Sequence, residues 1–376
     1  MAHHQIILVG SRLEAELLLV KEFRPDVVHL LYTKAVALQY KSLLDAFPRK
    51  VKVCEYEIDP YAIESISLLC VSIRDTLQEG DSLSYNITEG TKPSALACMA
   101  VARQRGDKVY YLSQEGELLD IGAHTRDFLN KGLTNEEFVT LYGNILNSYN
   151  LASQITPEQV QTAFSIKAFM EAHQKAFQHI QKQYRSQFGG RVEKLPPSFQ
   201  VEREHNMFLS SKGGAMTITD RGKVIFHSPH PDTLFQFFTG RWWEVIVSHY
   251  VYQWDLNRRS DSQVWRNVEF SSPGTTRTKN ELDILVNDRN RLILIECKSG
   301  YLGQENIYKI DGTRQTYGGR NSKGLLVTYY PLDESLRQKC EDLHIYNYSP
   351  PTEKDRPHFI EHIGAWLDSV VKELEQ

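Results

Sequence analysis

Two carboxylates and an amine lie among the mostly apolar strand residues of one stretch of this chain, NELDILVNDRNRLILIECKSG. Its two apolar runs predict a pair of β-strands, Glu281–Val286 and Leu292–Lys298, joined by a polar turn. Asp283 lies within the first strand, whereas Glu296 and Lys298 lie two positions apart in the second and therefore share a face. Because an isolated carboxylate buried in such a hairpin carries a large desolvation cost, these residues require a chemical explanation.

A divalent cation shared by the carboxylates would supply that explanation. A hairpin that folds at the polar turn brings Asp283 beside Glu296, and carboxylate oxygens suit magnesium or manganese. The main-chain carbonyl of Cys297 can also face the metal, and Glu244, on a preceding helix, offers a third acid. The cation would polarise a phosphodiester and lower the pKa of a bound water, while Lys298 orients that water or stabilises developing negative charge. The predicted catalytic residues are Glu244, Asp283, Glu296 and Lys298.

The arrangement resembles the active site of PD-(D/E)xK nucleases, which have the restriction-endonuclease-like fold. In that family an acidic helix residue precedes a hairpin that carries an acid and then an (E/D)-x-K triplet, as Glu244, Asp283 and the triplet ECK do here. The resemblance covers roughly 235–335 and implies an α/β nuclease domain. Two simpler interpretations stay open: an exposed ion pair within the triplet that contributes little, or a pairing of its lysine with Glu281.

Several polar residues near this hairpin have two interpretations. Lys309, Arg314 and Gln315 would contact phosphates if the helix after the hairpin faces nucleic acid, or would form its solvated face. A second group would follow a nucleic-acid backbone or lie on a solvated loop: Arg258, Arg259, Arg266, Arg277 and Lys279. Trp242 and Trp243 are interpreted as core anchors rather than as base-stacking platforms.

A second short stretch, YNITEGTKPSA, places a candidate anion site at the start of a helix. A predicted strand ends at Thr88, a short loop follows, and Pro93 opens a helix whose N-terminal N–H groups favour an anion. Gly90 permits close backbone approach, and Lys92 adds a positive charge. The stretch lacks the G-x-x-x-x-G-K-[ST] pattern of a Walker A loop, which disfavours a generic nucleotide triphosphatase. An ordinary capped helix start is the alternative interpretation.

The loop resembles the N-x-T-G-G-T-K signature of CARF domains, the CRISPR-associated Rossmann-like sensors, except that Glu89 replaces the first glycine. CARF domains also contact their ligand at the first β–α turn and at the end of the second strand, although Ser11 could simply cap a helix. The resemblance implies the following cyclic-oligoadenylate-binding residues: Gly10, Ser11, Arg12, Tyr32, Thr33, Asn86, Thr88, Glu89, Gly90, Thr91 and Lys92.

Strands and helices alternate over residues 1–145, which predicts an α/β fold with a parallel sheet and a ligand site beyond the carboxyl ends of its strands. Residues 146–200 are interpreted as a helical connector, and residues 201–376 as the nuclease domain. A CARF domain followed by a PD-(D/E)xK domain resembles the ancillary nucleases of type III CRISPR systems. The resemblance implies a homodimer that binds cyclic tetra-adenylate as an allosteric activator. The connector would then transmit closure to nuclease domains that cut DNA, RNA or both with little sequence specificity.

Composition adds a few constraints. The 376 residues carry a formal net charge of −4, so any polyanion site must be local. The five cysteines form no C-x-x-C pair, which disfavours a zinc site or a disulfide framework and favours a cytoplasmic protein. No apolar run approaches the ~18 residues of a membrane span. Two other functions stay open: a stand-alone DNA repair or restriction nuclease, and a regulator that responds to cyclic nucleotides and binds nucleic acid without cutting it.

Overall fold

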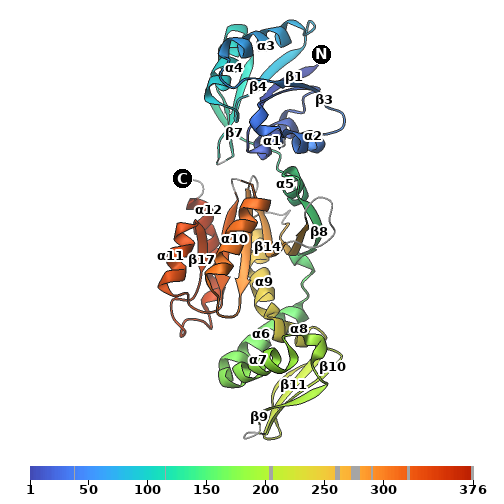
Figure 1. The fold of residues 1–376 in the computed structure, drawn as a ribbon, viewed down its shortest axis with the longest axis vertical. Coiled ribbons are helices and arrows are strands. Elements are labelled where there is room, and N and C mark those ends of the chain that lie inside the picture. Colours follow the sequence, from blue (N-terminus) through green and yellow to red (C-terminus); the bar gives the residue numbers. More distant parts are fainter. Residues whose placement is uncertain are drawn as a thin grey trace.

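The computed structural model describes residues 1–376 except 38, 115, 203–205, 259–262, 272–279, 289–290, 320–321 and 374–376. Three bodies follow one another along the long axis of the molecule (Figure 1). A seven-stranded sheet lies at the N-terminal end, a six-stranded sheet in the middle and a four-stranded sheet at the opposite end. The predicted α/β fold is confirmed. Within the described residues, no helix has both the length and the apolar character needed to cross a membrane.

The N-terminal sheet runs in the order β3-β2-β1-β4-β5-β6-β7, with parallel pairing from β3 to β5 and antiparallel pairing beyond. One core cluster lies under α1 and α2 and another under α3 and α4, so helices cover both faces of the sheet. The strands are β1 (His3–Leu8), β2 (Val27–Tyr32), β3 (Lys52–Glu57), β4 (Ser82–Asn86), β5 (Lys108–Leu112), β6 (Glu117–Asp120) and β7 (Thr125–Phe128). The helices are α1 (Leu13–Phe23), η1 (Lys34–Val36), α2 (Gln39–Ala46), α3 (Ile63–Asp75) and α4 (Lys92–Arg105).

The middle sheet runs in the order β17-β16-β15-β14-β13-β8 and contains the predicted hairpin as β14 and β15. Helix α9 packs on one face, and its Trp242 and Trp243 are buried core residues as expected, while α10 and α11 share a core cluster with β16. The strands are β8 (Ile145–Leu151), β13 (Trp265–Ser271), β14 (Asn280–Asp288), β15 (Arg291–Lys298), β16 (Lys323–Thr328) and β17 (Ile345–Tyr348). The helices are α9 (Arg241–Arg258), α10 (Gln304–Tyr317), α11 (Glu334–Asp342), η4 (Phe359–His362) and α12 (Ile363–Glu373).

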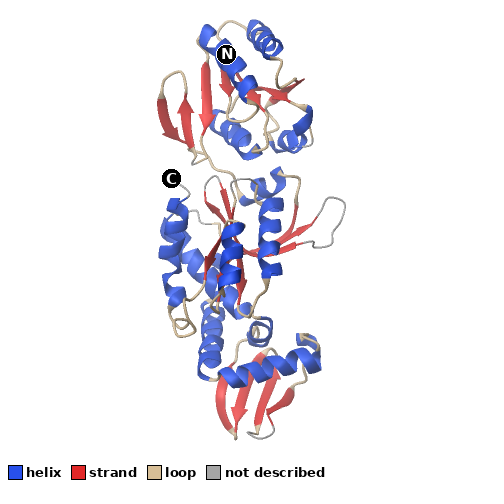
Figure 2. Cartoon of the chain, turned by 60° about the vertical axis from the view of Figure 1, so that its left-hand side comes forward, coloured by secondary structure: helices blue, strands red, loops and turns tan. Residues whose placement is uncertain are grey.

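The third body combines most of the expected connector with residues 201–239, which we expected in the nuclease domain. Residues 145–151 are instead an edge strand of the middle sheet, and the helices that follow pack beside an antiparallel sheet at the far end of the molecule (Figures 1 and 2). Two of these helices, α6 and α7, are separated at His173, where the backbone leaves the helical region. The elements are η2 (Ala152–Gln154), α6 (Pro157–Ala172), α7 (Gln174–Phe188), η3 (Val192–Lys194), β9 (Ser198–Glu202), β10 (Met207–Lys212), β11 (Ala215–Asp220), β12 (Lys223–Ser228) and α8 (Thr233–Thr239). The domain boundaries themselves stay predictions.

A short helix, α5 (Asn135–Leu141), joins the N-terminal and middle bodies. Its buried residues share one core cluster with residues of both sheets. Asn135 Nδ2 donates a hydrogen bond to the carbonyl of Gln263 at 2.9 Å, just before β13. On its other side, Glu137 pairs with Lys21 of α1 at 2.6 Å. Helix α5 therefore packs against both the N-terminal and the middle body.

Candidate functional site

Strands β14 and β15 separate where the two predicted acids lie. The last pair of their ladder is Ile284 opposite Ile295, and the next residues toward the open end are Asp283 and Glu296. The residues of β14 before Ile284 continue to pair with β13. The divergence therefore leaves space between two neighbouring strands, and both carboxylates are positioned beside it.

The Glu296 carboxylate is deeply buried, with only 3% of the residue's surface exposed. Its Oε1 accepts hydrogen bonds from Lys298 Nζ at 2.6 Å and from Lys309 Nζ at 3.1 Å. Burial works to lower the pKa of Lys298, but the charges of Glu296 and Asp283 outweigh it and raise that pKa to about 12. Lys298 is therefore positively charged at neutral pH and serves as a donor rather than as a base. It bonds with Glu296 and not with Glu281.

The Asp283 carboxylate reaches across the opening to β15. Its Oδ2 accepts a hydrogen bond from the backbone N–H of Cys297 at 2.6 Å. Burial, reinforced by the negative charges of Glu296 and Glu244, raises the pKa of Asp283 well above its ordinary value, and Lys298 offsets this only in part. The ionised form of Asp283 therefore needs additional positive charge nearby.

Glu244, the third predicted acid, lies in the first turn of α9. Arg241 Nε is 3.7 Å from Glu244 Oε2, one helical turn away. Burial raises the pKa of Glu244, and the charges of Arg241 and Lys298 act against that rise. The negative charge of Glu296 acts with burial, which places Glu244 within electrostatic range of the hairpin. The four predicted catalytic residues thus form one site, and their catalytic roles stay predictions.

The oxygen donors of this site fit a hard divalent cation. In the part of the chain that the structure describes, no three or more His, Cys, Asp or Glu side chains converge as a metal cluster. Asp283 and Glu296 nevertheless supply carboxylate oxygens and Cys297 a main-chain carbonyl, the donor type that magnesium and manganese prefer. The Cys297 thiol lies in the core cluster on the α9 side, and burial raises its pKa well above the ordinary value. The raised pKa of Asp283 marks an excess of negative charge that such a cation would relieve.

Helix α10 contributes Lys309 to the site, whereas its Arg314 and Gln315 make contacts within the helix. Lys309 reaches Glu296 from this helix, so the phosphate-facing interpretation fits it better than the solvated one. Arg314 and Gln315 donate instead to Asp311 of the same helix, at 2.6 and 2.7 Å. Sequence reasoning weighed Lys309 without placing it in the active site, because only the packing of α10 beside β15 shows which of its faces meets the carboxylates.

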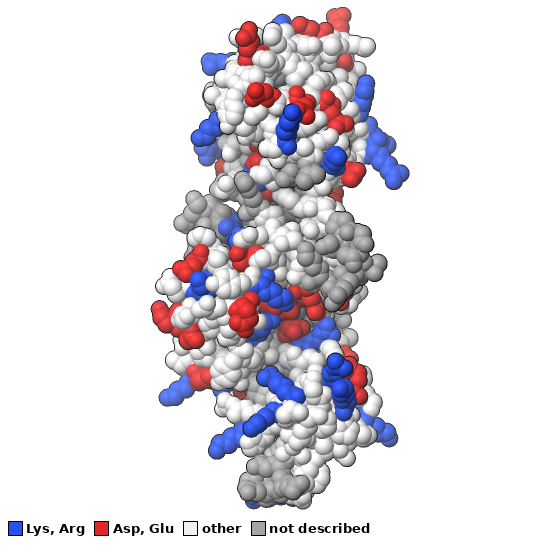
Figure 3. Space-filling view, in the orientation of Figure 1, with Lys and Arg blue, Asp and Glu red and all other residues white. Residues whose placement is uncertain are grey.

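Of the five basic residues expected to follow a nucleic-acid backbone, Arg258 and Arg266 lie within the described part of the chain. Arg258 pairs with Asp288 at 3.2 Å and lies over the ring of Trp254, so it stabilises the fold locally. Arg266 lines a pocket beside the acids and is taken up below. The others lie outside the described residues: Arg259, Arg277 and Lys279. Figure 3 shows acidic side chains gathered in a hollow of the middle body, with basic side chains next to them.

The predicted ligand-binding residues of the N-terminal body gather at one edge of its sheet. Strands β1, β2 and β4 are parallel neighbours, so their carboxyl ends lie side by side. The segments at these ends are Gly10–Arg12, Tyr32–Thr33 and Asn86–Lys92. The sheet topology therefore brings together three segments that are far apart in the sequence.

Some of these residues shape the loop before α4 rather than point away from it. Asn86 Oδ1 accepts from the N–H of Thr88 at 3.0 Å, and Thr88 Oγ1 accepts from the N–H of Leu112 at 2.9 Å. Thr91 caps α4, where its Oγ1 accepts from the N–H of Ser94 at 3.4 Å. These three side chains are positioning groups in this structure.

Other members suit direct contact with a ligand. Gly90 has a φ of +80°, and a Cβ there would lie 2.9 Å from the Cβ of Leu8, so the loop requires glycine. Lys92 is exposed at the first turn of α4. Tyr32 stacks its ring on Tyr40 with centroids 4.1 Å apart, which presents an aromatic wall at the same edge.

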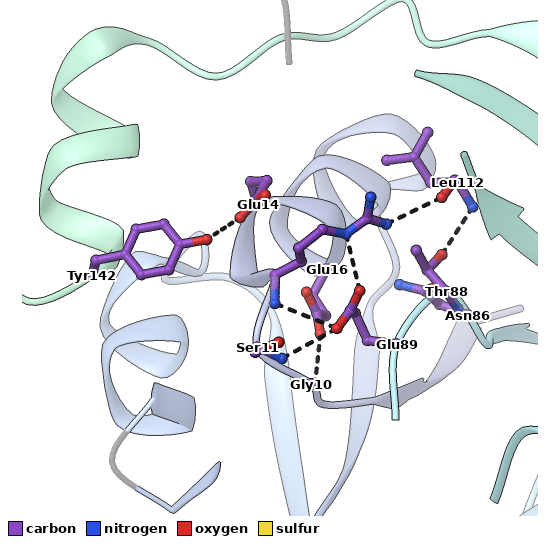
Figure 4. A network of polar contacts seen from close by, with 10 residues as sticks. Gly10, Ser11, Glu14, Glu16, Asn86, Thr88, Glu89, Leu112 and Tyr142 are labelled. Carbon is purple, nitrogen blue, oxygen red and sulfur yellow. Dashed lines mark hydrogen bonds and ion pairs between the residues drawn. The ribbon is translucent and has the colours of Figure 1, made fainter. Parts of the chain in front are cut away.

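Glu89, which stands where CARF domains usually have glycine, fills the start of α1 (Figure 4). Its Oε2 accepts from the N–H groups of Ser11 at 3.2 Å and Arg12 at 3.4 Å, and its Oε1 accepts from Arg12 Nε at 2.9 Å. A Cβ on Gly10 would lie 2.3 Å from Glu89 Oε2, so glycine makes room for this carboxylate. The helix terminus that would suit a ligand phosphate is therefore occupied by the protein's own anion.

Two further acids of α1 lie behind this network. Glu16 Oε1 accepts from the N–H of Gly10 at 3.0 Å, and its Oε2 has no partner among the described residues. Burial raises the pKa of Glu16 well above its ordinary value, although the Gly10 N–H works against the rise. Glu14 accepts a hydrogen bond from the hydroxyl of Tyr142, and burial raises its pKa as well.

Comparison with known proteins gives one family match and several solved structures of similar fold. Residues 232–367 match the family model of the Card1-like endonuclease domain. No curated protein matches the sequence. The structure of Can2 from Sulfobacillus thermosulfidooxidans in complex with cyclic tetra-adenylate is similar, with a TM-score of 0.72, 19% identity and coverage of 98% of this chain and 99% of that chain.

Two more solved structures share the fold. Protein VC1899 from Vibrio cholerae has a TM-score of 0.75 at 16% identity and covers 98% of each chain. A type III CRISPR defence DNA nuclease activated by cyclic oligoadenylate has a TM-score of 0.58 at 16% identity, over 89% of this chain and 47% of that chain. The predicted order of an N-terminal α/β domain with a parallel sheet and a C-terminal α/β domain is confirmed as a fold, and the second domain matches an endonuclease family model.

The first testable consequence concerns Glu16. A folded-state pKa raised above the unfolded value, ~4.3, means that stability is complete below the unfolded pKa and is lost as pH rises through the folded one. We expect Glu16→Gln to raise the free energy of unfolding by about 1–2 kcal/mol near pH 8, because the neutral amide carries no desolvated charge. Urea unfolding near pH 5 and near pH 8 measures this, and the gain should be smaller at the lower pH.

Glu79→Gln, which changes an exposed acid of the same domain, is the matched control and should alter stability little at either pH. A Glu16→Gln variant that is less stable than the wild type near pH 8 would contradict the analysis.

Proposed function

We propose that this chain is a metal-dependent endonuclease of type III CRISPR defence that is activated by a cyclic oligoadenylate. The observation that carries the proposal is the joint placement of Asp283, Glu296 and Lys298 at the open end of a buried hairpin. That hairpin lies inside the region that matches a Card1-like endonuclease domain. The solved structures of similar fold include a complex with cyclic tetra-adenylate, which supports the sensor half of the proposal.

The residues divide the chemical work as follows. Asp283, Glu296 and the carbonyl of Cys297 would hold the divalent cation, manganese or magnesium, which when bound supplies Lewis-acid stabilisation to the scissile phosphodiester. Lys298, held protonated, donates to the negative charge that develops on the phosphate. Glu244 adds a third acid at the mouth of the site. The substrate is a DNA or RNA phosphodiester, cut with little sequence specificity.

Activation depends on the N-terminal domain. A cyclic oligoadenylate, with cyclic tetra-adenylate as the expected ring, binds at the edge formed by Gly10–Arg12, Tyr32–Thr33 and Asn86–Lys92. A cyclic oligoadenylate with two-fold symmetry fits on the two-fold axis of a homodimer, so each protomer supplies one such binding edge of its sheet. The ring activates because it binds the closed dimer better than the open one.

The contacts between the domains supply a route for this signal. Tyr142 donates to Glu14 of α1, next to the ligand edge. A Cβ on Gly319 would lie 2.8 Å from the Tyr142 ring, so the same side chain packs on the segment just after α10. Helix α10 carries Lys309, which contacts Glu296. A shift of α1 can therefore reach the active site through Tyr142 and α10, which replaces the connector at 146–200 as the proposed path.

The central test is cleavage of labelled single-stranded DNA, supercoiled DNA and RNA with manganese or magnesium, each with and without cyclic tetra-adenylate. We expect cleavage that requires the ring, disappears when a chelator removes the metal, and falls about a hundredfold or more in Glu296→Ala. Glu334→Ala, an exposed acid of the same domain, should cut like the wild type.

The other outcomes separate the two halves of the proposal. Cleavage without any ring would retain the nuclease and reject the sensor. Absence of cleavage of all three substrates would reject the nuclease and favour a regulator that binds nucleic acid without cutting it.

Glu89 provides a second prediction, because a ligand phosphate must displace its carboxylate from Ser11 and Arg12. We expect Glu89→Gln to lower the ring concentration for half-maximal cleavage by about tenfold, since the amide leaves the positive charge of Arg12 unpaired and available to the phosphate. Lys92→Ala should instead raise the ring concentration for half-maximal cleavage. A titration of activator against cleavage rate measures both, and a Glu89→Gln variant that needs more ring would show that Glu89 orders the site instead.

Tyr142 provides a third prediction. Tyr142→Phe removes the hydroxyl that contacts Glu14 but keeps the ring packed on Gly319. We expect the Kd for cyclic tetra-adenylate to stay within about twofold of the wild type and the maximal cleavage rate to fall at least tenfold. The substitution removes the contact between the domains and leaves the ligand-binding edge intact. Calorimetric titration and cleavage rates at saturating ring measure the two quantities, with Tyr252→Phe of α9 as the control. Full cleavage by Tyr142→Phe would exclude this contact from the path.

A further inference from the structure

Arg266 of β13 is a partly buried cation that makes no direct contact with a carboxylate among the described residues. No hydrogen bond or ion pair joins its guanidinium to any described residue, whereas Arg258 and Arg291 of the same domain each pair with Asp288. Burial lowers the pKa of Arg266 and the charge of nearby Arg241 acts in the same direction, whereas the charges of Glu244 and Asp232 offset this only in part. Removing a guanidinium from water without a partner costs free energy, so its retention at this position calls for a ligand of opposite charge.

The backbone beside Arg266 is also unusual. The register of β13 with β8 shifts between Arg266 and Glu269, which marks a bulge. Within it Asn267 has a φ of +49°, in the left-handed region that a non-glycine residue adopts at a cost. Bulges next to active sites commonly redirect a side chain. The bulge here lets Arg266 project toward the α9 side of the sheet, where Arg241 lies.

The two arginines line a cavity of about 310 Å³ between the middle body and the body at the far end. Its other walls hold one carboxylate, Asp232, which accepts a hydrogen bond from Gln159 at 2.8 Å. They are otherwise rich in carboxamides, contributed by Asn150, Gln154, Gln159, Gln236 and Asn267. Gln236 is 2% exposed, and its Oε1 has no partner among the described residues. Phe235, 40% exposed, adds an aromatic face, with the guanidinium of Arg241 5.1 Å above its ring.

This cavity adjoins the candidate active site. Arg241 lines the cavity and also lies 3.7 Å from Glu244. Arg266 is the register partner of Ile284, the residue next to Asp283. One strand and one helix therefore carry both the acids of the site and the cations of the cavity.

We propose that this cavity binds one nucleotide of the substrate strand next to the scissile bond, with its phosphate on the guanidinium groups of Arg266 and Arg241. The volume exceeds what an inorganic anion needs and is at the lower end of the range of small-molecule sites. The carboxamides can donate to and accept from a base edge, and Phe235 offers a surface on which a base stacks. The inference rests on the proposed nuclease function and assigns a subsite to it.

An unstacked nucleotide fits such a cavity, so the preferred substrate is a single strand of DNA or RNA. DNA and RNA present the same phosphate group to the two arginines, so the test measures binding of each separately.

The test uses the full chain made cleavage-deficient by Glu296→Gln, with manganese and cyclic tetra-adenylate, and fluorescein-labelled single-stranded DNA or RNA of one mixed sequence. Fluorescence anisotropy gives Kd at several salt concentrations. We expect Arg266→Gln in this background to raise Kd about tenfold or more for at least one strand and to reduce the salt slope of log Kd by about 0.7–1, the signature of one lost phosphate contact. Lys223→Gln, which removes an exposed charge from β12, should change Kd less than about twofold.

Thermal unfolding without nucleic acid distinguishes a binding residue from a structural one. We expect Arg266→Gln to unfold at the wild-type temperature or above it, because an unpaired buried cation is lost. An unchanged Kd and salt slope, an equal loss in Lys223→Gln, a lower unfolding temperature, or no binding by the Glu296→Gln chain would each overturn the proposal. The proposed nuclease function fails separately, through absence of cleavage by the wild type, since these binding measurements require no turnover.

Discussion

Negative charge confined at the open end of the β14–β15 hairpin is the constraint on which the nuclease domain depends. Burial raises the pKa of Asp283 and of Glu244, and the negative charge of Glu296 adds to both rises because little water is left to screen it. Two lysines from different elements meet at a single oxygen of Glu296, which compensates part of this charge. The remaining excess makes the site suited to a divalent cation and explains why apolar strands tolerate acids there.

In the N-terminal domain the local environment is positive, and an acidic side chain compensates it. There the parallel strand ends and the start of α1 create a positive environment, and Glu89 neutralises it from within. Behind it, Glu14 and Glu16 are buried where ionisation is costly. In the proposed sensor an incoming phosphate would exchange one anion for another, so the affinity for a cyclic oligoadenylate would depend on how readily Glu89 leaves.

The two charge centres are joined by a compact junction rather than by a long linker. Helix α5 packs between the sheets, and Tyr142 after it touches both α1 and the end of α10. The body built from α6, α7 and the four-stranded sheet lies beyond the active site, where it forms one wall of the cavity that contains Arg266. The position of this body beside the cavity fits a role in substrate binding better than a role in signal transmission.

The sequence alone determined the local features of this protein. Alternating apolar patterns predicted the strands and helices, and the acids in the hairpin predicted the chemistry, because strand periodicity assigns faces without knowledge of distant partners. The tertiary structure alone decided which elements meet. Lys309 reaches Glu296 through the packing of α10, Glu89 reaches Arg12 across 77 positions, and residues 145–151 join a sheet instead of a connector. These contacts depend on how separate elements pack around a shared core, and no short-range pattern in the sequence records that packing.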